Sequence, residues 1–206
     1  MTPVRLVVAT RNPGKLAELR ELLDGLGIEL LCLLDFPDAP MVAEDFPSYV
    51  ENATGKARAI ARHTGIPALA DDSGLAVDAL DGNPGVHSAR FAGEPCSDRR
   101  NIEKLLRLLD RVPDAARTAH FRCVMVVAKP DSKPTLVVEG SVGGVITRTP
   151  RGSGGFGYDP VFLIPALAQT FAQLPAAEKN RISHRGRACA QLRERLPAFL
   201  RASPIS

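Results

Sequence analysis

The chain has 206 residues, 45% hydrophobic and 24% charged, a composition typical of one globular domain, here residues 1–206, with a sizeable core. Its net charge of +3 and its lack of Trp fit a small anionic ligand and argue against nucleic acid as a partner. No apolar stretch reaches the roughly 18 residues of a membrane span, and no signal peptide is expected. Four widely spaced cysteines without a C-x-x-C pair indicate reduced thiols in a cytoplasmic protein.

The first elements are a strand and a helix. Residues 4–9 form an apolar run that is typical of a buried strand. Leucines then recur at helical spacing after Asn12 and Pro13, which suit the N-cap and first turn of a helix, and Gly27 is expected to end that helix. A second strand is expected over residues 28–34.

The remaining pattern predicts a mixed α/β domain. A helix is expected from about Ser48 to His63, followed by a strand that ends at Asp71 and a turn at Ser73 and Gly74. The later elements are, in order, a helix capped by Asp98, two long strands at 117–128 and 135–147 joined by the hairpin loop 129–134, a short strand at 161–164, and helices at 175–181 and 184–201. This order predicts a long mixed central β-sheet flanked by helices.

A glycine-rich loop precedes the short strand. Residues 152–157 have the spacing G-x-G-x-x-G, but no helix follows them, so they do not form a dinucleotide-binding fingerprint. Phe156, Tyr158 and Asp159 place an aromatic face and a carboxylate beside backbone amides, a combination that can clamp a flat ring. The alternative is a cluster of turns that binds no ligand.

Two further segments have the chemistry of an anion site. Residues 10–15, TRNPGK, lie where a strand leads into a helix, and amides at a helix N-terminus attract anions; the alternative is a well-capped surface helix. Lys179, His184 and Arg185 flank a later helix start, where positive charge opposes the helix dipole and is better explained by an anionic ligand than by a solvated basic face.

Acidic residues form a third candidate site. Asp71 and Asp72 are adjacent, and two neighbouring carboxylates repel each other unless a cation compensates them. Magnesium binds one or two protein carboxylates together with waters and phosphates, and a nearby carboxylate can take the proton of an attacking water. Alternatively, Asp72 caps an Asx-turn. Glu44 lies in the preceding loop without an evident structural role.

These segments in this order resemble a known family. TRNPGK, ENATGKA, ADDSGLAVDAL, GVHSARFAG, GGFGYDP and EKNRISHRGRA are similar to the inosine triphosphate pyrophosphatase family, from about residue 4 to residue 200. The resemblance implies an ITPase-like, Maf-like fold with a cleft between two lobes. It also implies a Mg²⁺-dependent hydrolase that converts ITP, dITP and XTP to the monophosphate and pyrophosphate, and a homodimer.

The same resemblance implies roles for individual residues. It assigns Asp72 as the general base and Glu44 and Asp72 as metal ligands. It assigns substrate binding to Thr10, Arg11, Asn12, Pro13, Gly14, Lys15, Ser73, Phe156, Gly157, Tyr158, Asp159, Lys179, His184 and Arg185. A 6-oxo purine could accept a hydrogen bond from a backbone amide or Arg185, whereas adenine would leave that donor unpaired.

Two alternatives remain open at this point. One is a related nucleotide hydrolase that acts on modified pyrimidine or methylated nucleotides. The other is a nucleotide-binding regulator without turnover, against which the paired carboxylates argue. This sequence also departs from the family pattern at two places. Asp45–Phe46–Pro47 stands where the family often has a glycine, and Gly55 stands where it has a larger residue.

Overall fold

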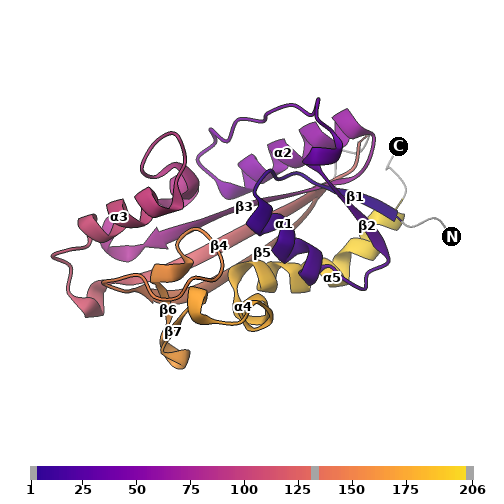
Figure 1. Ribbon diagram of the computed structural model, residues 1–206. Helices are drawn as coiled ribbons and strands as arrows, with labels where there is room; N and C mark the ends of the chain where they lie inside the picture. Colours follow the sequence, from indigo (N-terminus) through magenta and orange to yellow (C-terminus); the bar gives the residue numbers. More distant parts are fainter. Residues whose placement is uncertain (1–3, 131–134, 203–206) are drawn as a thin grey trace. The chain divides into compact units, whose positions relative to one another are not determined.

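The computed structural model describes residues 4–130 and 135–202. In these residues one seven-stranded sheet has the strand order β2-β1-β3-β4-β5-β6-β7 (Figure 1). Its strands are β1 (Val4–Val8), β2 (Ile28–Cys32), β3 (Ala68–Val77), β4 (Thr118–Ala128), β5 (Thr135–Ile146), β6 (Phe162–Ile164) and β7 (Gln169–Thr170). Strand β1 is parallel to β2 and β3, whereas β6 is antiparallel to β5 and β7, so the sheet is mixed as predicted.

Five α-helices accompany these strands in the described residues. They are α1 (Pro13–Leu22), α2 (Tyr49–Thr64), α3 (Asp98–Leu108), α4 (Ala176–Ile182) and α5 (His184–Arg201). Capping contacts define both ends of α2: the Ser48 hydroxyl accepts from the Glu51 amide, and Gly65 adopts the left-handed conformation at the C-cap. No helix in residues 4–130 and 135–202 has the length and apolar composition needed to cross a membrane.

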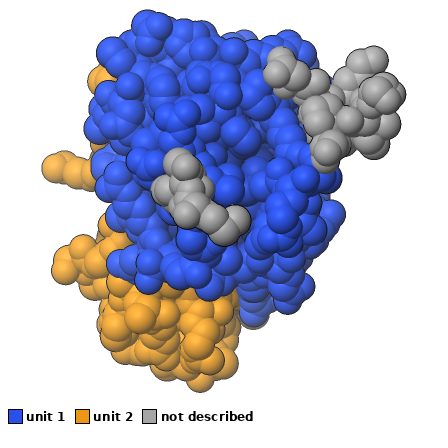
Figure 2. Space-filling view, turned by 90° about the vertical axis from the view of Figure 1, so that its right-hand side faces the viewer, with its two compact units in different colours: residues 1–72, 123–140, 186–206 blue, residues 73–122, 141–185 orange. Residues whose placement is uncertain are grey.

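The chain divides into two compact units, coloured in Figure 2. Unit 1 comprises residues 1–72, 123–140 and 186–206, and unit 2 comprises residues 73–122 and 141–185. The segments of each unit are far apart in the sequence, so each core depends on long-range packing. The chain passes from unit 1 to unit 2 within strand β3, after Asp72.

Unit 1 has helices on both faces of its part of the sheet. Side chains of β3 and β4 alternate between the faces. Leu69, Cys123 and Met125 pack with α1 and α5, whereas Ala70 and Val124 pack with α2. This alternation decides which helix each functional side chain meets.

Unit 2 has a separate core rich in aromatic residues. Leu105 of α3 packs with side chains of β3, β5 and β6 and with Phe121, Phe162 and Phe171. The rings of Phe121 and Phe162 lie 4.6 Å apart, and those of Phe162 and Phe171 lie 5.2 Å apart. These contacts hold the end of β4 against the segment that follows the glycine-rich loop.

The structure corrects several predicted boundaries. Strand β3 does not end at Asp71 but continues to Val77, so the expected turn at Ser73 and Gly74 is absent. Helix α1 ends at Leu22 rather than near Gly27, because Leu23 already takes the C-cap position.

Two other expectations concern the start of α3 and the loop between β4 and β5. The N-cap of α3 is Ser97, whose hydroxyl accepts from the Arg100 amide, and Asp98 is the first helical residue rather than the cap. The hairpin loop at 129–134 lies mostly outside the described residues, although the neighbouring positions of β4 and β5 in the sheet agree with a hairpin.

Candidate active site

Asp71 and Asp72 are consecutive residues of an extended strand, so their carboxylates point to opposite faces of the sheet. Asp71 lies on the α1 side, where it meets Lys15, and Asp72 lies on the α2 side, where it is nearest to Lys56. Each acid therefore has its own lysine. This arrangement explains how two adjacent carboxylates are tolerated inside a strand, and it rules out the alternative in which Asp72 caps an Asx-turn.

Lys15 and Cys123 both contact the Asp71 carboxylate. The Lys15 ammonium lies 2.5 Å from Asp71 Oδ1, and the Cys123 thiol donates to Asp71 Oδ2 at 3.0 Å. Lys15 belongs to the first turn of α1, where its backbone amide donates to the side chain of the N-cap residue Asn12 at 3.1 Å. The predicted anion-binding residue and one predicted acid thus form an ion pair.

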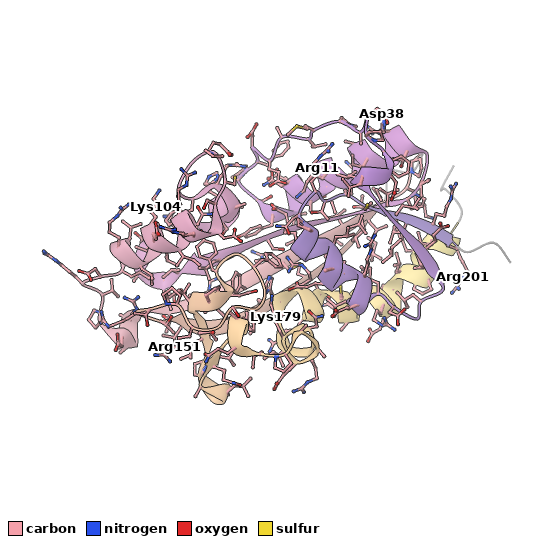
Figure 3. The ribbon with its side chains drawn as sticks, in the orientation of Figure 1. Arg11, Asp38, Lys104, Arg151, Lys179 and Arg201 are labelled. Carbon is pink, nitrogen blue, oxygen red and sulfur yellow. The ribbon has the colours of Figure 1, made fainter. Side chains whose placement is uncertain are left out.

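The other residues of the 10–15 segment surround the start of α1. The Asn12 amide donates to the Thr10 hydroxyl at 3.1 Å, and Pro13 is the first residue of the helix, followed by Gly14. The Arg11 guanidinium, labelled in Figure 3, donates to the Ala39 carbonyl at 3.2 Å. Arg11 therefore fastens the long loop before α2 to the α1 N-terminus.

On the Asp72 side, Lys56 connects the acids. Its ammonium donates to Glu44 Oε1 at 2.8 Å and to the Asp71 carbonyl at 2.9 Å, and it lies 3.9 Å from Asp72 Oδ1. Asp72 is only 4% exposed, and its Oδ2 has no hydrogen-bond partner among the described residues. Burial raises the pKa of the Asp72 carboxyl above its ordinary value, against the opposing charges of Lys56 and Lys15.

The loop that carries Glu44 is fixed by a buried amide. The Asn52 side chain of α2 accepts from the Phe46 amide at 3.0 Å and donates to the Phe46 carbonyl at 3.1 Å. This paired contact resembles one rung of a β-ladder and holds the loop at the N-terminal end of α2. The Phe46 ring approaches no closer than 4.0 Å to a Cβ built on Gly55, so ordinary packing covers that glycine.

The acids suit a divalent cation that also binds phosphates. No group of three or more His, Cys, Asp or Glu residues able to hold a metal occurs in the part of the chain that the structure describes. Glu44 and Asp72 nevertheless share one lysine, and a buried Asp72 oxygen lacks a partner in the same part of the chain. Two carboxylates are the protein share that magnesium usually takes, with waters and phosphates completing its shell.

In unit 2, the glycine-rich loop requires its glycines. Gly152 has a φ of +80°, and a Cβ there would lie 2.5 Å from the Ala172 backbone. Gly155 has a φ of +70°, and a Cβ there would clash with the Asp159 carboxylate. The Gly154 amide donates to the Ala172 carbonyl at 3.0 Å. The loop is therefore packed closely on its neighbours.

Carboxylates hold the loop's remaining amides. Asp159 accepts from the Phe156 amide at 2.9 Å and from the Lys179 ammonium at 2.5 Å. Asp98 accepts from the Gly157 amide at 2.7 Å. The amides of Phe156 and Gly157, expected beside a bound ligand, thus donate within the protein.

Two cations lie close to the Phe156 ring. The Lys179 ammonium lies 5.0 Å from the ring centroid, and the Arg185 guanidinium carbon lies 5.5 Å from it. Arg185 also donates to the Ser73 hydroxyl at 3.2 Å and is 1% exposed. Lys179, labelled in Figure 3, extends from α4. Five predicted residues of unit 2 (Ser73, Phe156, Asp159, Lys179 and Arg185) are thus linked by contacts.

Two other predicted residues pack into the unit 2 core. His184 stacks on the Phe121 ring, with centroids 4.6 Å apart and an angle of 11° between the planes. Tyr158 is buried, and its hydroxyl donates to the Ser88 carbonyl at 2.9 Å. Burial, assisted by the charge of Asp98, raises the pKa of Tyr158. The Tyr158 side chain therefore anchors the glycine-rich loop to the core of unit 2.

Comparison with known protein families identifies the family of this chain. The model of the Ham1 family matches residues 6–195. The chain belongs to the Ham1 family.

Similar proteins and structures extend over almost the whole chain. It is 55% identical to a dITP/XTP pyrophosphatase of Geobacter sulfurreducens, over 93% of this chain and 96% of that protein. It is 54% identical to a dITP/XTP pyrophosphatase of Geobacillus kaustophilus, over 92% of each chain. The structure of a HAM1 protein from Coxiella burnetii is 43% identical, with a TM-score of 0.86 over 95% of this chain and 99% of that one.

In this Ham1 chain, the sequence analysis missed four residues that hold the acids of unit 1 and the glycine-rich loop of unit 2 in place. They are Lys56, which joins the acids, Asn52, which fixes the Glu44 loop, Cys123, which contacts Asp71, and Asp98, which holds the glycine-rich loop. Lys56 and Asn52 both lie within the segment ENATGKA of α2, next to Ala53, Gly55 and Ala57. A lysine between small residues of a helix was the available signal.

Proposed function

We propose that this protein is a nucleoside triphosphate pyrophosphatase that hydrolyses dITP, XTP and ITP to the monophosphate and pyrophosphate. The observation that carries the proposal is the Asp72 carboxylate, which is buried, has a raised pKa and keeps one oxygen without a hydrogen-bond partner in the described residues. A group of this kind suits the removal of a proton from water. The relatives named as dITP/XTP pyrophosphatases support the substrate class.

In this proposal the phosphates bind at the start of α1. Residues 10–15 place backbone amides at the positive end of the helix, and Lys15 adds an ammonium. Asp71 holds that ammonium from the side of the sheet. The segment therefore attracts a polyanion while its lysine is already oriented.

Glu44 and Asp72 would hold the magnesium ion, and Asp72 would also accept the proton of the attacking water. When bound there, the metal would supply positive charge to the phosphates and so favour departure of pyrophosphate. Glu44, Asp71 and Asp72 bring three carboxylates close to the ammonium groups of Lys15 and Lys56. Lys56 orients both proposed ligands from its position between them.

The base would be recognised by the residues of unit 2. The Phe156 ring offers an apolar face for stacking, and Arg185 is a donor for the 6-oxo group of hypoxanthine or xanthine. Lys179 and Asp159 hold the Phe156 backbone and ring in place, and Gly157, Tyr158 and His184 form the support. Adenine has an amino group at the same position, which would leave the Arg185 donor unpaired.

The proposal also includes a homodimer, which the family resemblance implies, and a cytoplasmic location, which the widely spaced cysteines indicate. Light scattering on the purified protein tests the dimer, and cell fractionation tests the location.

The products of one incubation test the proposed activity. Full-length protein with dITP and Mg²⁺ is followed by ³¹P NMR, with ATP and dTTP as parallel substrates. We expect pyrophosphate and dIMP from dITP, and slow turnover of ATP and dTTP. Release of orthophosphate in place of pyrophosphate, or faster turnover of dTTP than of dITP, would contradict the proposal. Removing Mg²⁺ with a chelator should stop the reaction.

A further inference from the structure

Two buried cysteines of unit 1 differ in what their thiols contact. Cys123 and Cys189 are both fully buried and belong to the same hydrophobic cluster, formed with α1 and α5. The Cys189 thiol approaches the sulfur of Met125 at 3.7 Å, a contact between soft apolar groups. The Cys123 thiol donates to Asp71 Oδ2 at 3.0 Å. Only the second contact reaches a charged group.

The Asp71 carboxylate depends on its donors, because its side chain has no exposure. A buried ionised carboxylate is costly unless hydrogen bonds and an opposite charge compensate it. Lys15 supplies the charge at Oδ1, and the Cys123 thiol supplies a hydrogen bond at Oδ2. A donor on each oxygen also fixes the rotation of the carboxylate about its Cβ–Cγ bond.

The same contacts orient Lys15. Its side chain is 18% exposed, so its ammonium lies at the boundary between the buried acid and the start of α1. A lysine has four rotatable bonds and binds phosphate as a point charge, so its position must be set by a neighbour. Asp71 is that neighbour, and the direction of Asp71 Oδ1 is set by the thiol on the other oxygen.

We propose that Cys123 is a positioning residue: its thiol orients the Asp71 carboxylate, which in turn holds the Lys15 ammonium where a phosphate group of the substrate binds. The inference rests on the proposed function for the identity of the substrate. The thiol–carboxylate–ammonium chain itself rests on the contacts. Cys123 does not contact the reacting atoms in this arrangement.

Cys123→Ala, Cys123→Ser and Cys189→Ala in the full-length protein test the inference. The two alanine variants remove the same thiol from the same cluster, so both lose packing and only Cys123→Ala loses the donor to Asp71. For Cys123→Ala we expect a KM for dITP raised about 3- to 10-fold, with a smaller change in kcat, as for loss of one ordinary hydrogen bond, because a thiol is a weak donor.

Cys189→Ala and Cys123→Ser show whether the effect of Cys123→Ala comes from the lost donor to Asp71 or from lost packing. Cys189→Ala should keep the KM of the parent protein, and Cys123→Ser, which retains a hydroxyl donor, should recover it to within about twofold. The affinity for inorganic triphosphate, measured by calorimetry, should fall in Cys123→Ala by the same factor as KM rises. This binding measurement needs no turnover.

The outcomes distinguish the two proposals. Equal KM values and equal triphosphate affinities for Cys123→Ala and Cys189→Ala would overturn the positioning role. If Cys123→Ala did not fold, Cys123→Val, which has a similar volume but no donor, would take its place: a loss of triphosphate affinity in Cys123→Val that Cys123→Ser does not share would support the role, and equal affinities of the two variants would overturn it. Absence of pyrophosphate release by the parent protein would instead contradict the proposed function, and the calorimetric comparison would still decide the role of the thiol.

Discussion

Two buried carboxylates, Asp159 in unit 2 and Asp72 in unit 1, differ in how closely hydrogen-bond donors and a lysine approach them. In unit 2, Asp159 accepts from the Lys179 ammonium at 2.5 Å and from the Phe156 amide at 2.9 Å. In unit 1, Asp72 lies 3.9 Å from the Lys56 ammonium, and its Oδ2 has no hydrogen-bond partner in the described residues. Both acids are buried to a similar degree. Burial alone therefore does not separate a structural acid from a reactive one.

The difference assigns separate tasks to the two units. A fully compensated acid such as Asp159 stabilises the loop around Phe156, and a partly compensated acid such as Asp72 retains capacity for a proton or a metal. We therefore expect substitutions in unit 1 to reduce turnover, and substitutions in unit 2 to change stability or the choice of base. The following variants test that separation, from the largest expected effect to the smallest.

Asp72→Asn should lower kcat for dITP by about 10²- to 10⁴-fold, because the amide cannot accept the proton of the attacking water. The shape of the side chain is retained, so the folded protein should still bind inosine nucleotides. Steady-state kinetics with pyrophosphate detection measures the effect, and circular dichroism checks the fold. A kcat equal to that of the parent protein would remove Asp72 from the role of base.

Lys179→Met should lower the free energy of unfolding by about 3–5 kcal/mol, because it leaves Asp159 buried without its charge partner. The double variant Lys179→Met with Asp159→Asn should recover part of the loss, since it removes both charges. Denaturant unfolding of the three proteins measures these values. Equal stability of the single variant and the parent protein would show that the ion pair does not stabilise unit 2.

Arg185→Ala should reduce the preference for ITP over ATP by about tenfold, because a donor to the base edge is lost. Its kcat for ITP should change less than that of Asp72→Asn. Arg185→Lys is the matched control, since it keeps a cation near Phe156 but changes the donor geometry. The ratio of kcat/KM values for the two nucleotides is the measurement. An unaltered ratio in both variants would assign base selection to other groups.

Asp98→Ala should destabilise the protein by about 1 kcal/mol, because the Gly157 amide loses its acceptor. Asp98→Asn keeps an acceptor oxygen, so its free energy of unfolding should fall less than that of Asp98→Ala. Ser97→Ala is the control for helix capping, since it removes the N-cap of α3 but leaves the contact to Gly157 intact. If Asp98→Ala and Asp98→Asn were equally destabilised, the contact to the loop would not be the cause.

Local patterns predicted much of the fold. Capping residues placed α2 within about one residue at each end, and the α1 N-cap at Asn12 was also correct. The β3 strand was predicted too short, because adjacent aspartates are unfavourable in a buried strand. Lys15 and Lys56, each far from β3 in sequence, compensate them in the folded chain. The residues of β3 alone give no sign that lysines from distant parts of the sequence will offset the charges of its two aspartates.

The candidate site was predicted in part. The motifs located the acids, Lys15 and the residues around Phe156, since their types and spacing carry the chemistry. Residue type and spacing alone did not separate Asp71 from Asp72, and only the family resemblance assigned roles to Asp72. The alternation of the strand and the helices on either face give the two acids different neighbours. Cys123 was considered only for disulfide and metal sites, so its contact with Asp71 could not be foreseen.

The different tasks of Asp71 and Asp72 are tested most directly by binding of a divalent cation. Calorimetric titration of Mg²⁺ into the protein with a non-hydrolysable dITP analogue should show uptake by the parent protein and by Asp71→Asn, and loss of uptake by Asp72→Asn. Asp71→Asn should instead bind the analogue more weakly, since Lys15 loses its ion-pair partner. Full Mg²⁺ uptake by Asp72→Asn, or loss of it in Asp71→Asn alone, would contradict the account.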